Sequence, residues 1–250
     1  MLGSIKHAAQ GMILQMQKQD LIANNLANVN TVGYKGASLF VEYVERQMNN
    51  PNHEVLPERI IKADEVYVDY SAGTPIQTGN NFDLMIRGSG FFTVMTDEGI
   101  RYTRDGSFQL DSDGFLVDGM GAKVFGETGF IRVEQTRGNV TVLDDGKVMQ
   151  GGSDGHPPQE IDTLRISDFN KPYRLVRMGN SYFRPLQPNN PVVRSDGFVI
   201  KQGYLESSNV DNIKMMVDMI TAHRHYEMLS KAVQSEDATL DKTVNTVGKM

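Results

Sequence analysis

The side chains best able to do chemistry in this sequence are five histidines, a serine between two glycines and a glycine-rich stretch. His223 and His225 are two residues apart in a segment expected to be helical, so they do not share a face and cannot chelate one metal ion. Ser89 lies in Gly-Ser-Gly, which is not the nucleophile elbow of hydrolases. The glycines at 119–126 lack the spacing of a dinucleotide-binding loop. These residues therefore predict no catalytic site, no cofactor and no metal.

Asp111, Asp113 and Asp118 are the next candidates, because clustered carboxylates could bind calcium. Asp-Gly pairs recur in this region, among them those that begin at positions 105, 113, 118, 145 and 196, with short β-rich runs between them. Their spacing is not that of an EF-hand loop, whereas Asp-Gly between such runs is a strong hairpin signal. We interpret these aspartates as turn residues. Arg104 beside Asp105 is interpreted as a structural ion pair or a subunit contact.

Composition excludes several classes of protein. The 250-residue chain has a formal charge of 25 − 31 = −6, which argues against a nucleic-acid partner. Because cysteine is absent, disulfides, thiolate zinc sites, Fe–S clusters and cysteine nucleophiles are excluded. No apolar run is long enough for a membrane span. The start of the chain lacks the apolar stretch of a secretory signal peptide, so we expect a cytosolic protein or export without a cleaved signal.

Both ends of the chain are expected to form long helices with a heptad pattern. From residue 2 to about residue 30, the pattern is carried by Leu2, Ile5, Ala9, Met12, Met16, Gln19, Ala23 and Leu26. Near the C-terminus it is carried by Met215, Met219, Ala222, Tyr226, Leu229, Val233, Glu236, Leu240, Thr243 and Val247. Ser208 with Asp211 resembles the N-cap of this second helix. Because a lone helix cannot bury an apolar stripe, we expect the two helices to pair as a coiled coil.

The middle of the chain predicts β-structure. Residues 65–206 read as an all-β domain of many short strands, and all nine prolines lie between Pro51 and Pro191. Residues 34–64 read as a connector, part extended and part helical, with moderate helical periodicity over 39–48. The predicted fold class is therefore α+β, with residues 1–33 and 207–250 forming a helical coiled-coil domain around the central β domain.

One motif in the first helix is unusual. The segment IANNLANVNTVGYK, residues 22–35, contains four asparagines, which oppose helix formation unless their amides find partners or the helix is ending. Gly33 fits a C-terminal stop of the helix. One interpretation is a frayed helix end. The other is a set of amide donors and acceptors used in a crowded lattice of helices.

Several long motifs together resemble one known family. The segment IANNLANVNTVGYK is similar to the N-terminal signature of the bacterial flagellar rod and hook proteins. YTRDGSF at 102–108 and DGFLV at 113–117 resemble the β-domain pattern of that family, and QGYLESSNV at 202–210 resembles the entry into its C-terminal helix. Hook proteins of the family are much longer than this chain. Within the family, the length favours the proximal rod subunits, with the distal rod subunits as the alternative.

The resemblance implies a structural subunit rather than an enzyme. It implies helical self-assembly into the rod that crosses the periplasm, together with other rod and hook-basal-body proteins, and delivery by the flagellar type III export apparatus. The assembly residues that it implies on the helices are Ile5, Met12, Met16, Asn24, Asn25, Leu26, Asn28, Met215, Met219, Tyr226, Leu229, Val233 and Leu240. In the β domain, the residues that match the family motif are Thr103, Arg104, Asp105 and Gly106. An alternative from another class is a β-domain adhesin or carbohydrate-binding module.

Overall fold

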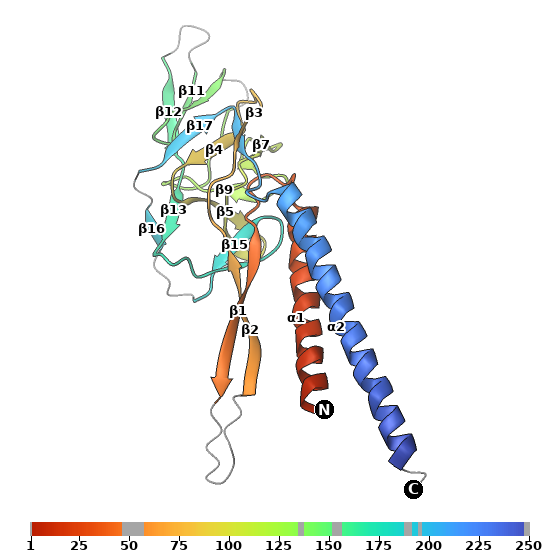
Figure 1. Ribbon diagram of the computed structural model, residues 1–250. Helices are drawn as coiled ribbons and strands as arrows, with labels where there is room; N and C mark the ends of the chain where they lie inside the picture. Colours follow the sequence, from red (N-terminus) through yellow and green to blue (C-terminus); the bar gives the residue numbers. More distant parts are fainter. Residues whose placement is uncertain are drawn as a thin grey trace. The chain divides into compact units, whose positions relative to one another are not determined.

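The computed structural model describes residues 2–46, 58–134, 138–151, 157–187, 192–194 and 197–247 (Figure 1). These residues form two compact units. Unit 1 comprises residues 1–29, 36–70 and 210–250, and unit 2 comprises residues 30–35 and 71–209. Helices lie at both ends of the chain and the strands lie between them, so the α+β class is confirmed. The predicted domain bounds, with residues 1–33 and 207–250 in a helical domain, 34–64 in a connector and 65–206 in a β domain, stay a prediction.

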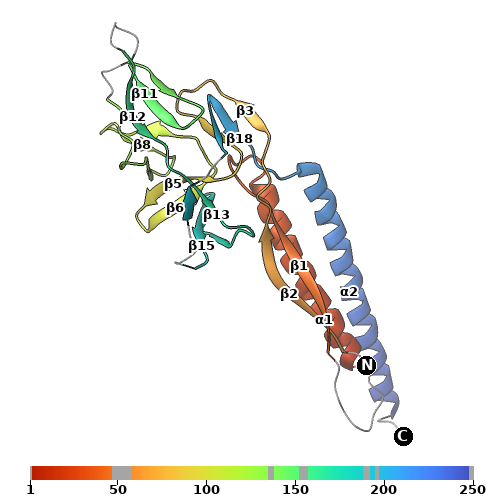
Figure 2. The ribbon, with the colours of Figure 1, turned by 90° about the vertical axis from the view of Figure 1, so that its left-hand side faces the viewer.

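Unit 1 is built on the two terminal helices, α1 (Leu2–Ala27) and α2 (Asn212–Val247). The helices lie side by side and antiparallel in both views, with the chain termini at the same end (Figures 1 and 2). Gly11 marks their close approach, because a Cβ atom added there would lie 3.1 Å from the Leu229 side chain. The two helices therefore pack together within one chain.

The exposure pattern along α2 follows the predicted heptad seam. Ala222 is fully buried, while the flanking Met216 and Met228 are 48% and 59% exposed. The other seam positions within the described side chains are all partly buried: Met215, Met219, Tyr226, Leu229, Val233, Glu236 and Leu240. The α2 seam is thus on the face that the sequence predicted.

The seam predicted on α1 is displaced. Met16 is 52% exposed, and Ala9 and Ala23 are exposed as well, so these positions do not face α2. The most buried side chains of α1 are instead Ile22 at 5% and Asn25 at 4%. Small and amide residues occupy much of the covered face of α1. A search for apolar residues at heptad spacing does not detect such a face.

A hairpin follows α1 in unit 1. Strand β1 (Ala37–Arg46) pairs antiparallel with β2 (Glu58–Val68), with a register shift between Phe40 and Val41. Both strands contact α1. The prediction of helix within the connector was wrong over 39–46, where alternating Val and Tyr side chains favour an extended strand. Its last two residues, 47 and 48, lie outside the described residues.

Both helix boundaries near the β region differ from the prediction. Helix α1 ends at Ala27, six residues before Gly33, and Asn28 Nδ2 donates to the Asn24 carbonyl at 2.8 Å, so a side chain satisfies an end carbonyl. Asp211, rather than Ser208, caps α2, because its carboxylate accepts the Lys214 backbone N–H at 3.0 Å.

Unit 2 consists of short antiparallel strands. A nine-stranded sheet within the described residues has the path β14-β15-β6-β5-β9-β8-β7, with β13 pairing β5 and β16. Its strands are β5 (Phe91–Thr96), β6 (Gly99–Thr103), β7 (Gln109–Leu110), β8 (Leu116–Val117), β9 (Lys123–Val124), β13 (Ile166–Phe169), β14 (Leu175–Arg177), β15 (Tyr182–Pro185) and β16 (Val192–Arg194). A smaller sheet has the order β10-β11-β12, with β10 (Val140–Val142), β11 (Lys147–Gln150) and β12 (Gln159–Thr163). Two further pairs join β3 (Pro75–Gln77) to β18 (Tyr204–Glu206) and β4 (Leu84–Arg87) to β17 (Val199–Gln202).

The core of unit 2 lies among these strands. Phe92, Val94, Ile131 and Ile200 are fully buried and belong to one continuous apolar cluster. The predicted Asp-Gly turns occur at 113 and 145, where Gly114 and Gly146 have φ of 82° and 89° and join β7 to β8 and β10 to β11. The central β-rich region is confirmed.

Candidate assembly site

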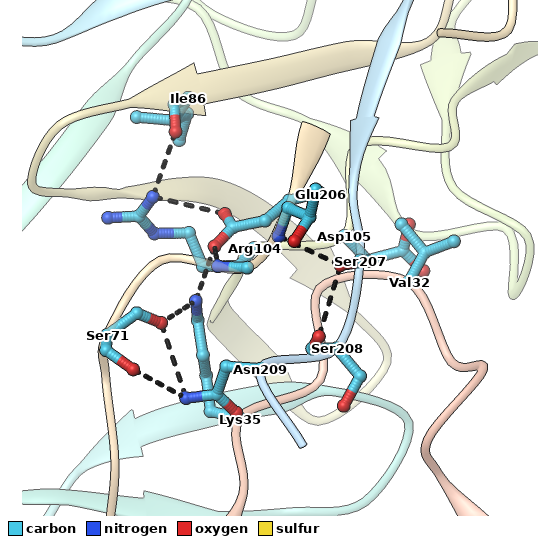
Figure 3. Close-up of polar contacts among 12 residues, drawn as sticks. Val32, Lys35, Ser71, Ile86, Arg104, Asp105, Glu206, Ser207, Ser208 and Asn209 are labelled. Carbon is cyan, nitrogen blue, oxygen red and sulfur yellow. Dashed lines mark hydrogen bonds and ion pairs between the residues drawn. The ribbon is translucent and has the colours of Figure 1, made fainter. Parts of the chain in front are cut away.

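The most deeply buried charges of unit 2 meet at Glu206, the last residue of β18 (Figure 3). Its Oε1 accepts hydrogen bonds from Lys35 Nζ at 2.5 Å and from the Gly73 backbone N–H at 2.9 Å. Its Oε2 pairs with Arg104 Nη1 at 3.3 Å. The three side chains are 0–6% exposed. We call Lys35, Arg104 and Glu206 the Glu206 cluster.

The two cations of the Glu206 cluster have further acceptors. Lys35 Nζ donates to the Ser71 carbonyl at 2.7 Å, and Arg104 donates to the Ile86 carbonyl at 3.1 Å (Figure 3). Arg104 also donates to the Gly88 carbonyl at 2.7 Å. The Arg104 guanidinium also lies 5.3 Å from the centroid of the Phe91 ring. Because a buried charge needs compensation, these contacts offset the loss of water around two cations that share one carboxylate.

The Glu206 cluster joins three distant parts of the sequence. Lys35 ends the asparagine-rich motif, Arg104 follows β6, and Glu206 lies six residues before the start of α2. The backbones meet as well, because the Gly33 N–H donates to the Glu206 carbonyl at 2.8 Å and the Asn209 N–H donates to the Tyr34 carbonyl at 3.4 Å. The segment that leaves α1 and the segment that enters α2 are therefore fastened to each other inside unit 2.

The predicted β-domain motif, residues 103–106, lies at this junction. Thr103 Oγ1 donates to the Ser181 carbonyl at 3.1 Å and accepts the Asp105 N–H at 3.0 Å. Asp105 accepts both the N–H and the hydroxyl of Ser107, at 2.9 and 2.6 Å. A Cβ on Gly106 would lie 1.7 Å from the Leu84 carbonyl oxygen. Each residue of the motif therefore has a structural role in shaping the turn after β6.

Three acidic groups near this turn titrate away from their ordinary values. Burial raises the pKa of the Asp105 carboxyl above 3.8, against the opposing effect of the Ser107 hydrogen bonds. Burial raises the pKa of Tyr182, and its hydrogen bond to Asp118 adds to the rise. Burial and then a 2.9 Å hydrogen bond to Asp168 raise the pKa of Tyr173 to about 12. All three shifts come mainly from desolvation, which is what a folded core produces.

The predicted helix residues divide between paired and exposed positions. Asn25 is the best-connected of them, because its amide donates to the Ala37 carbonyl at 2.6 Å, accepts the Ala37 N–H at 2.9 Å and contacts the Met215 sulfur at 3.8 Å. Ile5, Met12, Leu26 and Asn28 are partly buried, whereas Met16 and Asn24 are exposed. Their assignment to an interface between subunits stays a prediction.

Sequence reasoning did not single out Glu206 or pair Lys35 with it. Both residues stood within quoted motifs, but 171 positions separate them, and no local pattern reports a contact over that distance. The available signal was chemical. A lysine and a glutamate stood inside motifs otherwise dominated by small and amide residues, which invites a search for a partner of opposite charge.

The geometry defines a class of protein before any comparison. In the described ranges no group of three or more His, Cys, Asp or Glu could hold a metal ion, and no helix has the length and apolar character of a bilayer crossing. The buried polar groups are bound to one another in a junction. The described residues thus form an α+β protein with a long helix at each end and a buried ionic junction in its β-rich unit.

Family comparisons identify the subunit further. Three family descriptions match the chain: "Flagella basal body rod protein" at residues 5–35, "Flagellar hook protein FlgE/F/G D1 domain" at 85–150 and "Flagellar basal body rod FlgEFG protein C-terminal" at 201–246. The chain belongs to the flagellar basal-body rod protein family. It is therefore a structural component of the flagellar rod and not an enzyme, and the family implies assembly with other basal-body proteins.

Relatives in this family cover nearly the whole chain. The flagellar basal-body rod protein FlgG of Agrobacterium fabrum is 33% identical over 92% of this chain and 94% of its own length. FlgG of Borreliella burgdorferi is 32% identical over 96% of this chain and 97% of its length. The rod protein FlgF of Caulobacter vibrioides is 32% identical over 92% of both chains.

Proposed function

We propose that this chain is a FlgF-type subunit of the proximal rod. The supporting observation is the number of gaps in two alignments to proteins of Caulobacter vibrioides. The alignment to FlgF has 232 positions and covers 92% of the 250 residues of this chain, which is about 230 residues. About 2 alignment positions are therefore gaps in this chain. The alignment to FlgG has 259 positions and covers 96% of this chain, which is 240 residues, so about 19 positions are gaps in this chain. The FlgF alignment therefore needs fewer gaps, which favours a FlgF-type subunit.

Assembly is proposed to proceed through the terminal helices, which pair as a coiled coil and pack against neighbouring subunits in a helical lattice. Large apolar side chains remain exposed along both helices: Ile13, Met16, Ile213, Met216, Val217, Ile220 and Met228. Exposed apolar stripes on a helix require a partner. Heterologous contacts that do not close on themselves would extend such packing into a rod.

The proposed route to the assembly is type III export without a cleaved signal, followed by incorporation in the periplasm. The absence of cysteine supports this route, because no disulfide can block passage of an unfolded chain. The proposed partners are the neighbouring rod subunits, other copies of this chain and the export apparatus.

FlgG is the second candidate, favoured by the slightly higher identity of 33% to the Agrobacterium fabrum protein. Complementation separates the two. We expect the chain to restore motility to a bacterium that lacks its own FlgF and not to one that lacks FlgG. Restoration of only the FlgG-deficient strain would contradict the proposal.

Deletion of the α1 helix tests the assembly proposal itself. Residues 2–29 are the appropriate deletion, because residues 30–35 belong to unit 2 and include Lys35 of the Glu206 cluster. We expect no rods in isolated basal bodies and no motility, with secretion of the variant as the control. Complete rods built from the deleted variant would refute assembly through the helices.

A further inference from the structure

Unit 2 carries opposite charges in two parts of its sequence. Residues 165–194 hold six basic residues and one acidic residue, a net charge of +5 in a chain whose total is −6. The basic residues are Arg165, Lys171, Arg174, Arg177, Arg184 and Arg194. Residues 97–162 hold six basic and thirteen acidic residues, a net charge of −7. A subunit with oppositely charged parts can attract a copy of itself.

A cavity of about 250 Å³ lies in the basic part. It is formed by the loop between β13 and β14 and by the chain after β15, and its lining residues are Asn170, Lys171, Pro172, Arg174 and Gln187. The Leu186 N–H donates to the Arg174 carbonyl at 2.8 Å, which fastens one wall to the other. The Tyr173 hydroxyl donates to Asp168, which connects the loop to strand β13. We call this cavity the basic pocket.

The cations of the basic pocket have no carboxylate partner in the described part of the chain. Neither Lys171 nor Arg174 forms an ion pair there, and Lys171 Nζ lies 5.7 Å from the centroid of the Tyr173 ring. Two cationic side chains and two carboxamides line one small cavity. Guanidinium, ammonium and amide N–H groups together match the acceptor oxygens of a carboxylate.

We propose that the basic pocket binds a carboxylate from an acidic turn of a second copy of this chain. This inference rests on the proposed self-assembly and names the contact that unit 2 would add to the helices. Asp97 in the β5–β6 turn and Asp113 in the β7–β8 turn are exposed and form no ion pair with a described residue. Different surfaces meet in a heterologous contact, so the acidic and basic parts of neighbouring copies come together.

Charge reversal in the full-length chain tests the pocket. Arg174→Glu is the test variant, and Arg87→Glu is the matched control, because both arginines are exposed residues of unit 2 and each change alters the charge equally. We expect Arg174→Glu to raise the protein concentration needed for assembly about tenfold or more, and Arg87→Glu to leave it within about twofold. Light scattering gives the concentration, and circular dichroism checks the fold of both variants.

A second charge reversal, on the acidic turn, provides the decisive test of the proposed contact. Arg174→Glu combined with Asp97→Lys or with Asp113→Lys restores opposite charges between neighbouring copies, so one of these combinations is expected to recover assembly. Raising NaCl from about 0.05 to about 0.5 M should weaken wild-type assembly and leave Arg174→Glu little changed. Equal assembly of Arg174→Glu and wild type, or no recovery in either combination, overturns the inference. Failure of the wild-type chain itself to assemble contradicts the proposed function instead.

Discussion

Glu206 balances two buried cations with one carboxylate, so its charge matters more than its shape. Replacement by glutamine keeps the size but leaves Lys35 and Arg104 without an ionic partner, and removing one member of a buried ion pair costs about 3–5 kcal/mol. We expect Glu206→Gln to lower the unfolding free energy of unit 2 by this amount in urea titrations followed by near-ultraviolet circular dichroism.

The matched control for Glu206 is Glu98→Gln. Glu98 also pairs with an arginine, Arg101 at 3.1 Å, but its side chain is 73% exposed. Exposed pairs contribute about 0–1 kcal/mol, so the control is expected to change stability little. Similar losses of unfolding free energy in both variants would mean that burial does not determine how much the Glu206 contacts stabilise the protein.

Gly33 illustrates a residue that the sequence flagged for the wrong reason. The sequence predicted a helix stop, but the helix ends earlier, and Gly33 is required because its φ is +65° and a Cβ would lie 2.3 Å from the Asp105 backbone nitrogen. That contact joins residues more than seventy positions apart. Local propensity identifies a glycine as special, but only the tertiary structure shows which neighbour excludes a side chain.

Substitution of Gly33 separates its two constraints. Gly79 has a similar φ of +74° but nothing within 4 Å of an added Cβ, so Gly79→Ala measures the backbone cost alone, about 1–2 kcal/mol. Gly33→Ala adds a backbone clash, and we expect a clearly larger loss of thermal stability. An equal loss for both variants in calorimetry would exclude the clash as the cause.

Tyr173 should make stability depend on alkaline pH. Its folded pKa is raised from 10.0 to about 12, so the unfolded chain releases the phenolic proton first. The stabilisation is fully present below pH 10 and is lost as the pH rises from 10 to about 12. In urea titrations across this range, the wild type is expected to lose stability more steeply than Tyr173→Phe, and parallel slopes would contradict the assigned cause.

At the scale of elements, sequence periodicity predicted α2 better than α1. In α2 most of the covered seam positions are apolar, so a search for apolar residues at heptad spacing finds them. In α1 the covered face includes Gly11 and Asn25, whose contacts are a close approach to Leu229 and a hydrogen-bonded bridge to Ala37. Periodicity of apolar residues cannot report packing through glycine or recognition through an amide. The hairpin of β1 and β2 was missed for a related reason, because strand pairing depends on a partner further along the chain.

The contact between Leu229 and Gly11 allows a test of the pairing of α1 with α2. Leu229 lies against Gly11 on the seam, while its neighbour Met228 is 59% exposed. A carboxylate at position 229 would be desolvated in the helix interface. We expect Leu229→Asp to abolish rod assembly and motility. Met228→Asp is the control, because it places the same charge at an exposed position of α2. Cross-linking of cysteines introduced at Gln10 and Ser230, next to Gly11 and Leu229, measures whether α1 and α2 pair. Pairing retained in Leu229→Asp would show that the seam is misassigned.

At the scale of the whole molecule, the two units differ in how much they bury. Among the side chains that the structure describes, the largest fully buried ones all belong to unit 2, including Phe91, Phe92 and Leu84, whereas the helices of unit 1 bury mainly Ile22 and Ala222. Because stability follows buried apolar area, unit 1 of the free subunit should unfold at lower urea concentration than unit 2. The ellipticity at 222 nm is expected to fall before the near-ultraviolet signal of the β-structure.

Two core substitutions assign these transitions to the units. Ala222→Asp places a charge at a fully buried helix position and is expected to shift only the first transition. Leu84→Ala removes a side chain that is 1% exposed in unit 2 and is expected to shift only the second, by about 2–5 kcal/mol. A single transition seen equally by both signals, and moved by both substitutions, would mean that the helices and the β unit fold as one. Separate transitions would leave the helices free to reorganise on assembly while the junction at Glu206 stays folded.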